Sequence, residues 1–547
     1  MPRRLSICII NPRFHPSFWG HEFALPLLPG DRRCWIATGA LPLLAALIPP
    51  GHDVEIIDEN VDTLNFESLR RHDVIGVTGM IVQRERMFEI LAALKSLPAV
   101  VAVGGPYASV SPSVFAGRAG AVFVGEAEET WPEFLNAVAE GRPFQPIYQQ
   151  REKTDMTRVP IPRYDLLKTK HYFAASVQFS RGCPFACEFC DIITIYGRKP
   201  RMKTPAQLIA ELEHVCQAGF RSCSLVDDNF IGNRVAAKAM LPELIAWQRS
   251  HGYPLHLSTE ASIDLAEYPE LIDLMVEANI LSVFIGIESP RYSSLEETRK
   301  HQNTRGDSLL AKIKRIRDGG LVISSGFIVG FDNDDQRIFD EQYTFIQEAN
   351  LAQAMPAVLF PVPTTPLYAR LAAEGRLDLS NPEIAFHPKQ MTREELRAGH
   401  LQLLHRLYQP AAYFERVLRG YRQSPAFRRR RAVLARSIGR RVTVRAKVLQ
   451  TLMGVKTGAK LLVAMARRGC LLSVGSSYAK TYLRENLPLG KEAIPFGAFV
   501  QQCVLHWHYY LIARDRRNTA FGVSGTVESS SRAIPLTQVV GHDITGA

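Results

Sequence analysis

The sequence predicts an α/β protein of three parts: a doubly wound parallel sheet in residues 1–145, a partial six-stranded (β/α) barrel in residues 173–385, and a mainly helical, basic region in residues 386–547. Three observations predict this. Short runs rich in Val and Ile alternate with amphipathic stretches in the first two parts, as in parallel sheets covered by helices. A loop with three cysteines opens the second part, and an excess of Lys and Arg marks the third. Residues 146–172, with few periodic apolar positions, are interpreted as a linker.

In the first part, short apolar runs predict five parallel strands: Leu5–Ile10, Val54–Asp58, Val74–Thr78, Val100–Val103 and Ala121–Val124. The amphipathic stretch Glu85–Leu97 predicts a helix between two of them. Ligands of such sheets bind beyond the carboxyl ends of the strands, where glycine lets the backbone approach a ligand closely. The candidate binding residues at these ends are Thr78, Gly79, Gly104, Gly105, Gly125 and Glu126. The alternative is that the glycines only make tight turns.

The second part predicts six strands, at Val177–Phe179, Ser222–Val226, Leu255–Ser258, Leu281–Ile287, Val322–Val329 and Ala357–Phe360. A helix is predicted at Pro205–Ala218, because Thr204 is a suitable N-cap and Pro205 suits a first helical turn. Six βα units fit a partial, open barrel. The active site of such a barrel lies at the carboxyl tips of its strands.

Three cysteines, Cys183, Cys187 and Cys190, stand in the loop that opens the second part. Their spacing, C-x-x-x-C-x-x-C, supplies three thiolates. Iron–sulfur cubanes normally take four cysteines, so this loop leaves one iron open to bind a small molecule. The alternative is a structural zinc site, which needs four ligands and usually C-x-x-C pairs. Asp191 or His171 would then have to complete the set, and the spacing therefore favours the cluster.

With this loop and a preceding α/β domain, residues 1–420 resemble cobalamin-binding radical S-adenosylmethionine (SAM) enzymes. Several segments are similar to the hopanoid C-2 methylase subgroup, which carries a C-terminal domain of unknown function: Ile81–Arg84, Gly182–Phe185, Cys190–Ile192, Asp227–Asn233 and Gly326–Asp332. The resemblance implies that the first part is a Rossmann-like cobalamin-binding domain and the second a radical SAM barrel.

The resemblance also implies a role for each matching residue. Cys183, Cys187 and Cys190 would ligate a 4Fe–4S cluster, and SAM would chelate its fourth iron. The implied SAM contacts are Phe189 against the adenine, Asp227, Asp228 and Asn229 near the amino group, Glu260 and Glu288 at the ribose or methionine part, and Ile328 and Gly330 beside the adenine. In the same order, the structural alternatives are a buried aromatic side chain for Phe189, a solvated turn for the Asp-Asp-Asn segment, surface ion pairs for the two glutamates, and an ordinary buried strand for the last two residues.

For cobalamin, the resemblance implies binding at the candidate residues of the first sheet. Cobalamin modules usually carry Asp-x-His-x-x-Gly after their first strand, with the histidine as lower cobalt ligand. Here the segment Asn11-Pro-Arg-Phe-His15 stands in that region, and Gly20 is out of register. His15 or His21 could reach a metal, but a lone loop histidine is more often polar surface. No lower cobalt ligand is therefore assigned.

Composition places the chain among folded cytoplasmic proteins. It has 547 residues with 46% hydrophobic content and no run of about 18 apolar residues. The apolar part of its start is short, so we expect a first strand there rather than a signal peptide. Six of the nine cysteines lie outside the loop and are scattered among apolar neighbours, which predicts burial rather than disulfides. They are Cys8, Cys34, Cys216, Cys223, Cys470 and Cys503.

The net charge of +11 is concentrated in residues 416–468, which hold 16 Lys or Arg and no Asp or Glu. Such asymmetry predicts an acidic partner surface. Basic and apolar residues alternate at Ala432–Ile438 and Val442–Leu452. Helices of this kind can lie on an anionic membrane. Nucleic acid is disfavoured, because aromatics are sparse among the arginines and no RNA-binding module is recognised.

Aromatic residues in Phe499–Ala513 suggest the same partner. Trp507, Tyr509 and Tyr510 are of the types that favour the lipid–water interface. The alternative is a helical cap packed on the barrel.

The resemblance finally implies a reaction: methylation of an unactivated carbon of a lipidic or polycyclic substrate, through a 5′-deoxyadenosyl radical and methylcobalamin. The cofactors carry this chemistry, and the protein orients them. An electron donor such as flavodoxin or ferredoxin is implied, and a lipid substrate would fit peripheral contact with the inner membrane face. One alternative uses the same cofactors without methyl transfer, as in oxidative cyclisation of a tetrapyrrole. Another is a non-catalytic cobalamin sensor.

Overall fold

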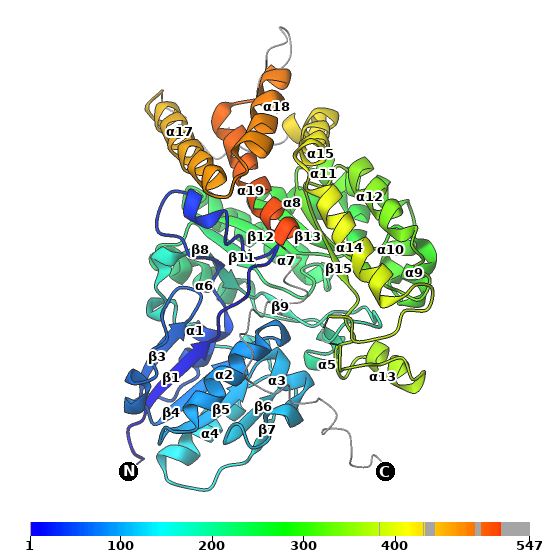
Figure 1. The fold of residues 1–547 in the computed structure, drawn as a ribbon. Coiled ribbons are helices and arrows are strands. Elements are labelled where there is room, and N and C mark those ends of the chain that lie inside the picture. Colours follow the sequence, from blue (N-terminus) through cyan, green and yellow to red (C-terminus); the bar gives the residue numbers. More distant parts are fainter. Residues whose placement is uncertain (1, 382, 430–431, 433–443, 487–493, 516–547) are drawn as a thin grey trace.

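A computed structural model describes residues 2–381, 383–429, 432, 444–486 and 494–515. It confirms the predicted fold class, with a parallel six-stranded sheet, a second parallel sheet that forms a half-barrel, and a helical C-terminal region. The first sheet lies at one end of the molecule and the C-terminal helices at the other, with the half-barrel between them (Figure 1).

The first sheet has the strand order β3-β1-β4-β5-β6-β7, and all neighbours are parallel. Its strands are β1 (Ser6–Asn11), β3 (Asp53–Asp58), β4 (Val74–Thr78), β5 (Val100–Gly104), β6 (Ala121–Val124) and β7 (Ile147–Gln149). The five predicted strands are present. β7 lies in the stretch interpreted as a linker. The winding direction reverses between β1 and β4, where ligands of doubly wound sheets bind.

Helices cover both faces of this sheet: α1 (Ala40–Ala46), α2 (Arg84–Leu94), α3 (Pro106–Val110) and α4 (Thr130–Ala139). The predicted helix at Glu85–Leu97 is α2. Alternate residues of β1 enter separate cores, because successive side chains of a strand point to opposite faces. Cys8 and Ile10 pack in one core and Ile7 in the other.

The second sheet has the order β15-β14-β13-β12-β11-β8-β2 and is also parallel throughout. Its strands are β2 (Cys34–Ile36), β8 (Tyr172–Val177), β11 (Ser222–Leu225), β12 (His256–Glu260), β13 (Ile280–Glu288), β14 (Val322–Val329) and β15 (Gln353–Val358). The strand predicted at Val177–Phe179 begins earlier, as β8. β8 ends at Val177, because the Asp227 carboxylate accepts hydrogen bonds from the backbone N–H groups of Phe179 and Ser180.

A short pairing follows β8, in which β9 (Ser180–Arg181) and β10 (Arg201–Met202) are antiparallel. β2 pairs with β8, so a segment of the predicted first domain forms the edge of the half-barrel. Three residues are too few to show periodicity, and the sequence analysis assigned no strand there.

Helices cover the outer face of the half-barrel and its tips: α5 (Ile192–Ile195), α6 (Pro205–Gln217), α7 (Arg234–Ser250), α8 (Pro269–Glu277), α9 (Tyr292–Glu297), α10 (His301–Thr304), α11 (Leu309–Asp318), α12 (Ile338–Glu348) and α13 (Pro366–Ala373). The predicted cap of α6 is confirmed, because Thr204 Oγ1 accepts a hydrogen bond from Gln207 N at 3.2 Å.

The C-terminal region consists of α14 (Arg393–Leu407), α15 (Pro410–Gln423), α17 (Val444–Arg467), α18 (Ser476–Asn486) and α19 (Phe496–Asp515), with a π-helical turn at Leu471–Gly475. The predicted basic stretch Ala432–Ile438 lies outside the described residues apart from its first residue. The first two residues of Val442–Leu452 also lie outside them. No helix in the described part of the chain is long and apolar enough to span a bilayer.

α19 closes the open side of the half-barrel. Gln353 of β15 donates a hydrogen bond to Tyr509 Oη, and His508 Nε2 lies 2.9 Å from the Ser17 carbonyl oxygen. His21 lies between His508 and Trp35 of β2. α19 and the segment 12–33 therefore bridge β15 and β2, the two edges of the sheet.

Two of the three aromatics expected at a lipid interface are fully buried, which corrects that expectation. Trp507 and Tyr509 are enclosed, and Tyr510 is half-buried. The alternative, a helical cap on the barrel, is what the structure has. The expected burial of the scattered cysteines is confirmed for Cys8, Cys223, Cys470 and Cys503. Cys34 and Cys216 are half-buried, and all nine thiols are free.

We expect Trp507→Ala to destabilise the protein, because removing a buried aromatic side chain costs about 3–5 kcal/mol. Denaturant unfolding followed by circular dichroism measures the effect. Leu472→Ala, at a side chain that is 87% exposed, is the matched control, and we expect a change within about 0.5 kcal/mol. Equal stability of Trp507→Ala and the wild type would contradict the buried cap.

Candidate active site

The three loop cysteines lie between β9 and α5. Cys187 is buried, and Cys183 and Cys190 are half-buried. Their sulfur atoms are not gathered within 4.8 Å of one another, as donors of a single ion would be. Burial raises the pKa of Cys183 and of Cys190, and the nearby Cys187 thiol raises both further. A cluster of several iron atoms fits thiols that lie too far apart to bind one ion. Bound metal would also remove the protons from these thiols despite their raised pKa.

Glycine is required at the base of this loop. Gly182 has φ +97°, and a Cβ there would lie 2.9 Å from the Gly197 carbonyl oxygen and 3.0 Å from that of Lys199. Cys183 N donates a hydrogen bond to the same Gly197 oxygen at 3.3 Å. The Asp228 carboxylate accepts from Gly182 N at 2.7 Å. Segment 197–199 therefore packs directly on the backbone beside the first cysteine.

Asp227 and Asn229 tie the tip of β11 to its neighbours. Asp227 accepts hydrogen bonds from Phe179 N at 2.8 Å, from Ser180 N at 3.0 Å and from Ser180 Oγ at 2.7 Å. Asn229 Nδ2 donates to Ser262 Oγ at 3.0 Å, beyond the tip of β12. Both side chains thus position the loop, and their direct contact with SAM stays a prediction.

Three carboxyl groups make an acidic pole at the tips of β11 and β12. Burial raises the pKa of Asp227 and of Glu260 to about 7, and that of Asp228 to about 6. The two aspartates raise the pKa of Glu260 further. A positively charged ligand would stabilise their ionised forms, so this pole suits SAM.

Glu288, at the tip of β13, occupies a strained position. Its φ is +64°, and the register of β13 shifts between Gly286 and Glu288. Lys300 Nζ donates to Glu288 Oε1 at 2.7 Å and lies 5.7 Å from the ring centroid of Phe189. A Cβ on Gly286 would lie 2.2 Å from Glu288 Oε1. Left-handed residues other than glycine gather at functional sites, because their strain must be held by the surroundings.

Lys300 is a site residue that the sequence analysis missed. Burial alone would lower its pKa, but Glu288 and then Cys187 raise it above the usual value. A cation therefore lies among the predicted SAM and cluster ligands. Lys300 stands in a short turn after α9 with no motif around it, so no sequence signal marked it.

α10 supplies a second group that the sequence analysis missed. Gln302 Nε2 donates to Cys187 Sγ at 3.6 Å, while its Oε1 is buried without a partner. Asn303 Nδ2 donates to the carbonyl oxygens of Gly286, at 3.2 Å, and Ile287, at 2.8 Å. Hydrogen bonds to ligand sulfur tune the potential of an iron–sulfur cluster. Gln302 is therefore placed to adjust the cluster.

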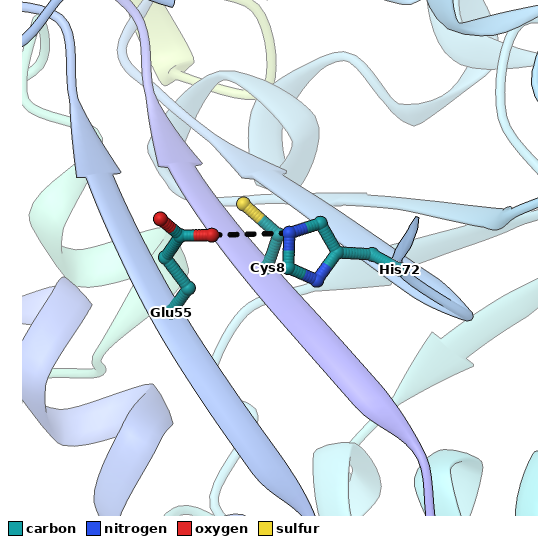
Figure 2. Close-up of side chains that lie close together, drawn as sticks. All are labelled: Cys8, Glu55 and His72. Carbon is teal, nitrogen blue, oxygen red and sulfur yellow. Dashed lines mark hydrogen bonds and ion pairs between the residues drawn. The ribbon is translucent and has the colours of Figure 1, made fainter. Parts of the chain in front are cut away.

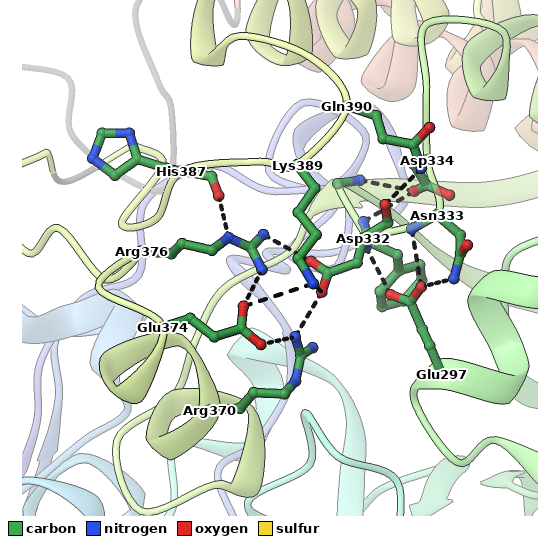
Figure 3. A network of polar contacts seen from close by, with 12 residues as sticks. Glu297, Asp332, Asn333, Asp334, Arg370, Glu374, Arg376, His387, Lys389 and Gln390 are labelled. Carbon is green, nitrogen blue, oxygen red and sulfur yellow. Dashed lines mark hydrogen bonds and ion pairs between the residues drawn. The ribbon is translucent and has the colours of Figure 1, made fainter.

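A network of charges holds the Cys187 side of the loop. Arg370 binds both carboxylate oxygens of Glu188, at 2.7 and 3.1 Å, and Asp332 at 2.6 Å. Figure 3 shows Arg376 and Lys389 converging on the same Asp332 carboxylate, at 2.7 and 2.9 Å. Burial alone would raise the pKa of Asp332, but these cations hold it well below its usual range. The network fixes the loop from outside the half-barrel.

The two remaining predicted SAM residues lie on β14 and just after it. Ile328 is half-buried, and its register partner on β15 is Ala357. Gly330 has φ +103°, and a Cβ there would lie 3.0 Å from Leu396 Cδ2 and 3.2 Å from Phe386 Cζ. Glycine at 330 therefore serves close packing against α14. Its adenine contact stays a prediction.

The first sheet has a pocket at the carboxyl ends of its strands. Four predicted cobalamin residues, Thr78, Gly104, Gly105 and Gly125, line it together with Ala102 and Trp131, and its empty volume is about 430 Å³, open mouth included. Small side chains on the central strands leave this space between α1 and α4.

Two features of the pocket fit the nucleotide tail of cobalamin. The Trp131 Nε1–H is buried without a hydrogen-bond partner, which leaves a donor for a ligand. Gly105 has φ +91°, and a Cβ there would lie 2.7 Å from Thr78 Oγ1. Gly79 is outside the pocket lining, and a Cβ there would meet Met87 Sδ at 2.7 Å.

Glu126 instead joins the first sheet to the β9–β10 pair that flanks the cysteine loop. Its Oε1 accepts hydrogen bonds from Arg181 at 2.9 Å and Arg201 at 3.0 Å, and Arg181 also pairs with Glu128. Arg181 precedes the cysteine loop directly. The carboxylate is therefore engaged in this ion cluster, and its predicted contact with cobalamin stays a prediction.

The two candidate lower ligands are placed differently. His21 is buried between Trp35 and His508, with Nδ1 unpartnered, and burial lowers its pKa to about 3. His15 is half-buried in the loop after β1. For the zinc alternative, His171 binds the Asp31 carbonyl oxygen at the opposite end of β8 from the cysteines. It does not complete their set.

One other group of potential metal ligands occurs in the described part of the chain: Cys8, Glu55 and His72 in the first sheet (Figure 2). His72 Nε2 lies 3.1 Å from Glu55 Oε2, and the Arg71 guanidinium binds the same oxygen. Burial raises the pKa of the Cys8 thiol, which keeps it neutral. An arginine already neutralises the carboxylate, so we assign no metal here.

Comparison with known proteins places this site in a family. Residues 177–345 match the radical SAM superfamily, and residues 365–518 match a domain of unknown function, DUF4070. The chain belongs to the radical SAM superfamily. It is 41% identical to an uncharacterized methyltransferase of Synechocystis sp., over 75% of this chain and 77% of that protein. It is 33% identical to the hopanoid C-2 methylase of Rhodopseudomonas palustris, over 76% and 78%.

A solved structure shares the fold. The cobalamin-dependent radical SAM enzyme OxsB, with aqua-cobalamin and SAM bound, aligns with a TM-score of 0.58 at 14% identity, over 94% of this chain and 79% of that one. The predicted membership, including the C-terminal domain, and the predicted enzyme class, a radical SAM methyltransferase, are confirmed. The family uses the predicted 4Fe–4S cluster and SAM, and the shared fold accommodates cobalamin in its solved relative.

We expect Gln302→Leu to lower the reduction potential of the cluster, because it removes a hydrogen bond to a ligand sulfur. The shift should be roughly 20–65 mV, the equivalent of about 0.5–1.5 kcal/mol for one hydrogen bond. Redox titration followed by electron paramagnetic resonance measures it. Gln336→Leu, at an exposed glutamine, should leave the potential unchanged. An unchanged or raised reduction potential in Gln302→Leu would show that Cys187 receives no hydrogen bond from Gln302.

We expect SAM to bind more tightly as the pH rises from 6 to 8. Asp228 and Glu260, with pKa values of about 6 and 7, lose protons in this range and become anions that attract positively charged SAM. The dissociation constant should fall about tenfold, since one pKa unit corresponds to about 1.4 kcal/mol. Isothermal titration calorimetry under anoxic conditions measures it.

Glu260→Gln should flatten this pH profile, while Glu270→Gln, at an exposed glutamate paired with Lys238, should retain it. A profile unchanged by Glu260→Gln would remove Glu260 from the acidic pole that binds SAM.

Proposed function

We propose that this protein is a cobalamin-dependent C-methyltransferase that methylates an unactivated carbon of a lipidic, hopanoid-like substrate. One observation carries the proposal: the carboxyl tips of the two sheets meet at the cysteine loop. Glu126 follows β6 and binds Arg181 beside the loop, while Ile195 of α5 packs into the core of the first sheet. A corrin on the first sheet and a cluster on the loop would then face a common space.

Each side of that space would hold one cofactor. Cys183, Cys187 and Cys190 would bind the cluster, and the acidic pole with the Lys300–Glu288 pair would orient SAM. The glycine-lined pocket and the free Trp131 N–H would hold the cobalamin tail. When bound, these groups supply the electron, the 5′-deoxyadenosyl radical and the methyl group. The chain's own residues orient them and exclude water.

Exposed apolar side chains support a lipidic substrate. Trp19 is half exposed, and its ring lies 4.6 Å from that of Phe284 of β13. Met80 and Val82, beyond the tip of β4, are also exposed. Exposed apolar residues next to a binding site commonly contact an apolar ligand. The similarity to a hopanoid methylase supports the same substrate class.

Product analysis tests the function. Enzyme reconstituted anoxically with iron, sulfide and cobalamin is supplied with dithionite, SAM carrying a deuterated methyl group, and a hopanoid extract. We expect 5′-deoxyadenosine and a product heavier by one labelled methyl group. Ring closure without added carbon would support the cyclase alternative, and a failure to make 5′-deoxyadenosine would support the sensor.

Ala102→Leu separates the two cofactor sites, because it fills the pocket of the first sheet without touching the cysteine loop. We expect cobalamin affinity to fall by about tenfold or more, since the added side chain takes the space of the nucleotide tail. Absorbance titration with cobalamin measures this. Iron content and SAM cleavage should persist. Unchanged cobalamin binding would show that the tail lies elsewhere.

We further propose that α17 rests on an anionic membrane. Its buried stripe, with Leu461 and Met465, packs toward α19. An exposed apolar stripe on another side of the helix consists of Leu452, Val455, Ala459, Leu462 and Ala466, and Lys456, Lys460 and Arg467 are exposed beside it. Apolar residues at spacings of three and four form one face, and flanking cations suit lipid headgroups.

Vesicle co-sedimentation tests this contact. Binding to vesicles with 30% anionic lipid should exceed binding to neutral vesicles and fall about tenfold in Val455→Asp/Leu462→Asp, which places charges in the apolar stripe. Tyr292→Asp/Val322→Asp, at exposed side chains of the half-barrel, is the matched control. Equal binding by the two double variants would exclude α17 as the contact.

A further inference from the structure

We propose that an acidic one-electron carrier protein docks on a surface beside the cysteine loop, which we name the entry surface: Pro184, Arg198, Lys199, Pro200 and Val235. The inference requires the cluster but not the identity of the substrate. It therefore stands or falls separately from the proposed methylation.

An electron has to cross the protein surface directly to the cluster. The chain holds one cysteine triplet, and the other six thiols are free and lie singly in the sequence, four of them buried. Among the described residues, the cysteines therefore offer no second cluster that could relay an electron. The electron must therefore enter where the least protein separates the cysteine loop from solvent.

Other segments of the protein cover parts of the loop. Gln302 contacts Cys187, and Arg370 clamps the adjacent Glu188. On the Cys190 side, Ile195 of α5 is buried in the core of the first sheet. These contacts favour the Cys183 side, where exposed cations lie, as the approach from solvent.

On the Cys183 side, a single layer of backbone separates the ligand from exposed side chains. Cys183 N binds the Gly197 carbonyl oxygen at 3.3 Å, and the next two residues, Arg198 and Lys199, are exposed. Arg198 Nη2 also donates to the Pro184 carbonyl oxygen at 3.0 Å, within the loop itself. A partner that touches either cation is thus one residue away from a cluster ligand.

The charge of this surface selects an acidic partner. Arg198 and Lys199 form no ion pair among the described residues, whereas the cations on the Cys187 side are neutralised by Glu188, Asp332 and Glu374. Unpaired surface cations steer an oppositely charged protein and orient it. The entry surface is therefore the cationic face of the loop.

An apolar centre completes the surface. Val235, at the start of α7, is 82% exposed. The nearby Gly232 lies against both prolines, because a Cβ there would be 3.2 Å from Pro184 Cδ and from Pro200 Cγ. Arg234, half exposed, stands at the rim. An apolar centre with a charged rim is the usual anatomy of a protein interface.

The electron balance is simple. A reduced carrier, with flavin or iron–sulfur chemistry, loses one electron and is oxidised by one unit. The 4Fe–4S cluster gains that electron and passes from the 2+ to the 1+ state. No proton or group is transferred in this step.

The test measures the rate of cluster reduction by reduced flavodoxin, in stopped-flow absorbance, with the reconstituted full-length enzyme. In Arg198→Glu/Lys199→Glu we expect the rate to fall at least about tenfold, because two attractive charges become repulsive. Dithionite, a small reductant that needs no docking, should reduce wild type and variant equally. Lys95→Glu/Lys480→Glu carries the same charge change at exposed lysines elsewhere and should react like wild type.

Two further measurements guard against a folding defect beside the cluster. Val235 lies on α7, outside the loop. Val235→Glu should also slow cluster reduction by flavodoxin and leave reduction by dithionite unchanged. In the wild type, raising the salt concentration should slow cluster reduction by flavodoxin but not by dithionite. Flavodoxin rates that match the wild type in both entry-surface variants, or a wild-type rate independent of salt, would overturn the proposal.

Discussion

The buried carboxylate of Glu126 is the contact that anchors the cysteine loop to the first sheet. It extends from the tip of β6 and is held by Arg181 and Arg201 on either side of the cysteine loop. All three side chains are largely withdrawn from water, so losing one would leave an uncompensated buried charge. Because only Gly182 separates Arg181 from the first cysteine, the same ion cluster also helps to position the predicted cluster ligands.

Much of this site could be predicted from local sequence. The cysteine triplet is marked by its three-ligand spacing, and Thr204 with Pro205 marks the start of a helix by capping chemistry alone. Residues at strand tips were also predictable, because parallel strands bring their carboxyl ends to one edge. Thr78, Gly104, Gly105 and Gly125 accordingly line one pocket. Asp227 showed the limit, since its carboxylate holds the backbone of Phe179 and Ser180 and its contact with SAM stays a prediction.

What could not be predicted depends on contacts between distant segments. Lys300 and Gln302 have no motif, and their role follows from the fold that brings α10 against the loop. Trp507 and Tyr509 fit a membrane interface by residue type, yet Tyr509 binds Gln353 and both are enclosed. An apolar, aromatic helix has the same composition whether lipid or protein covers it, so sequence alone left this alternative open.

The half-barrel is finished by opposite ends of the chain: its edge strand β2 begins at Cys34, and α19, which bridges the gap, ends at Asp515. During synthesis β2 must wait for α19, because domains otherwise fold from the N-terminus as they leave the ribosome. The nascent protein therefore exposes an open sheet edge and an apolar interior until α19 has been made.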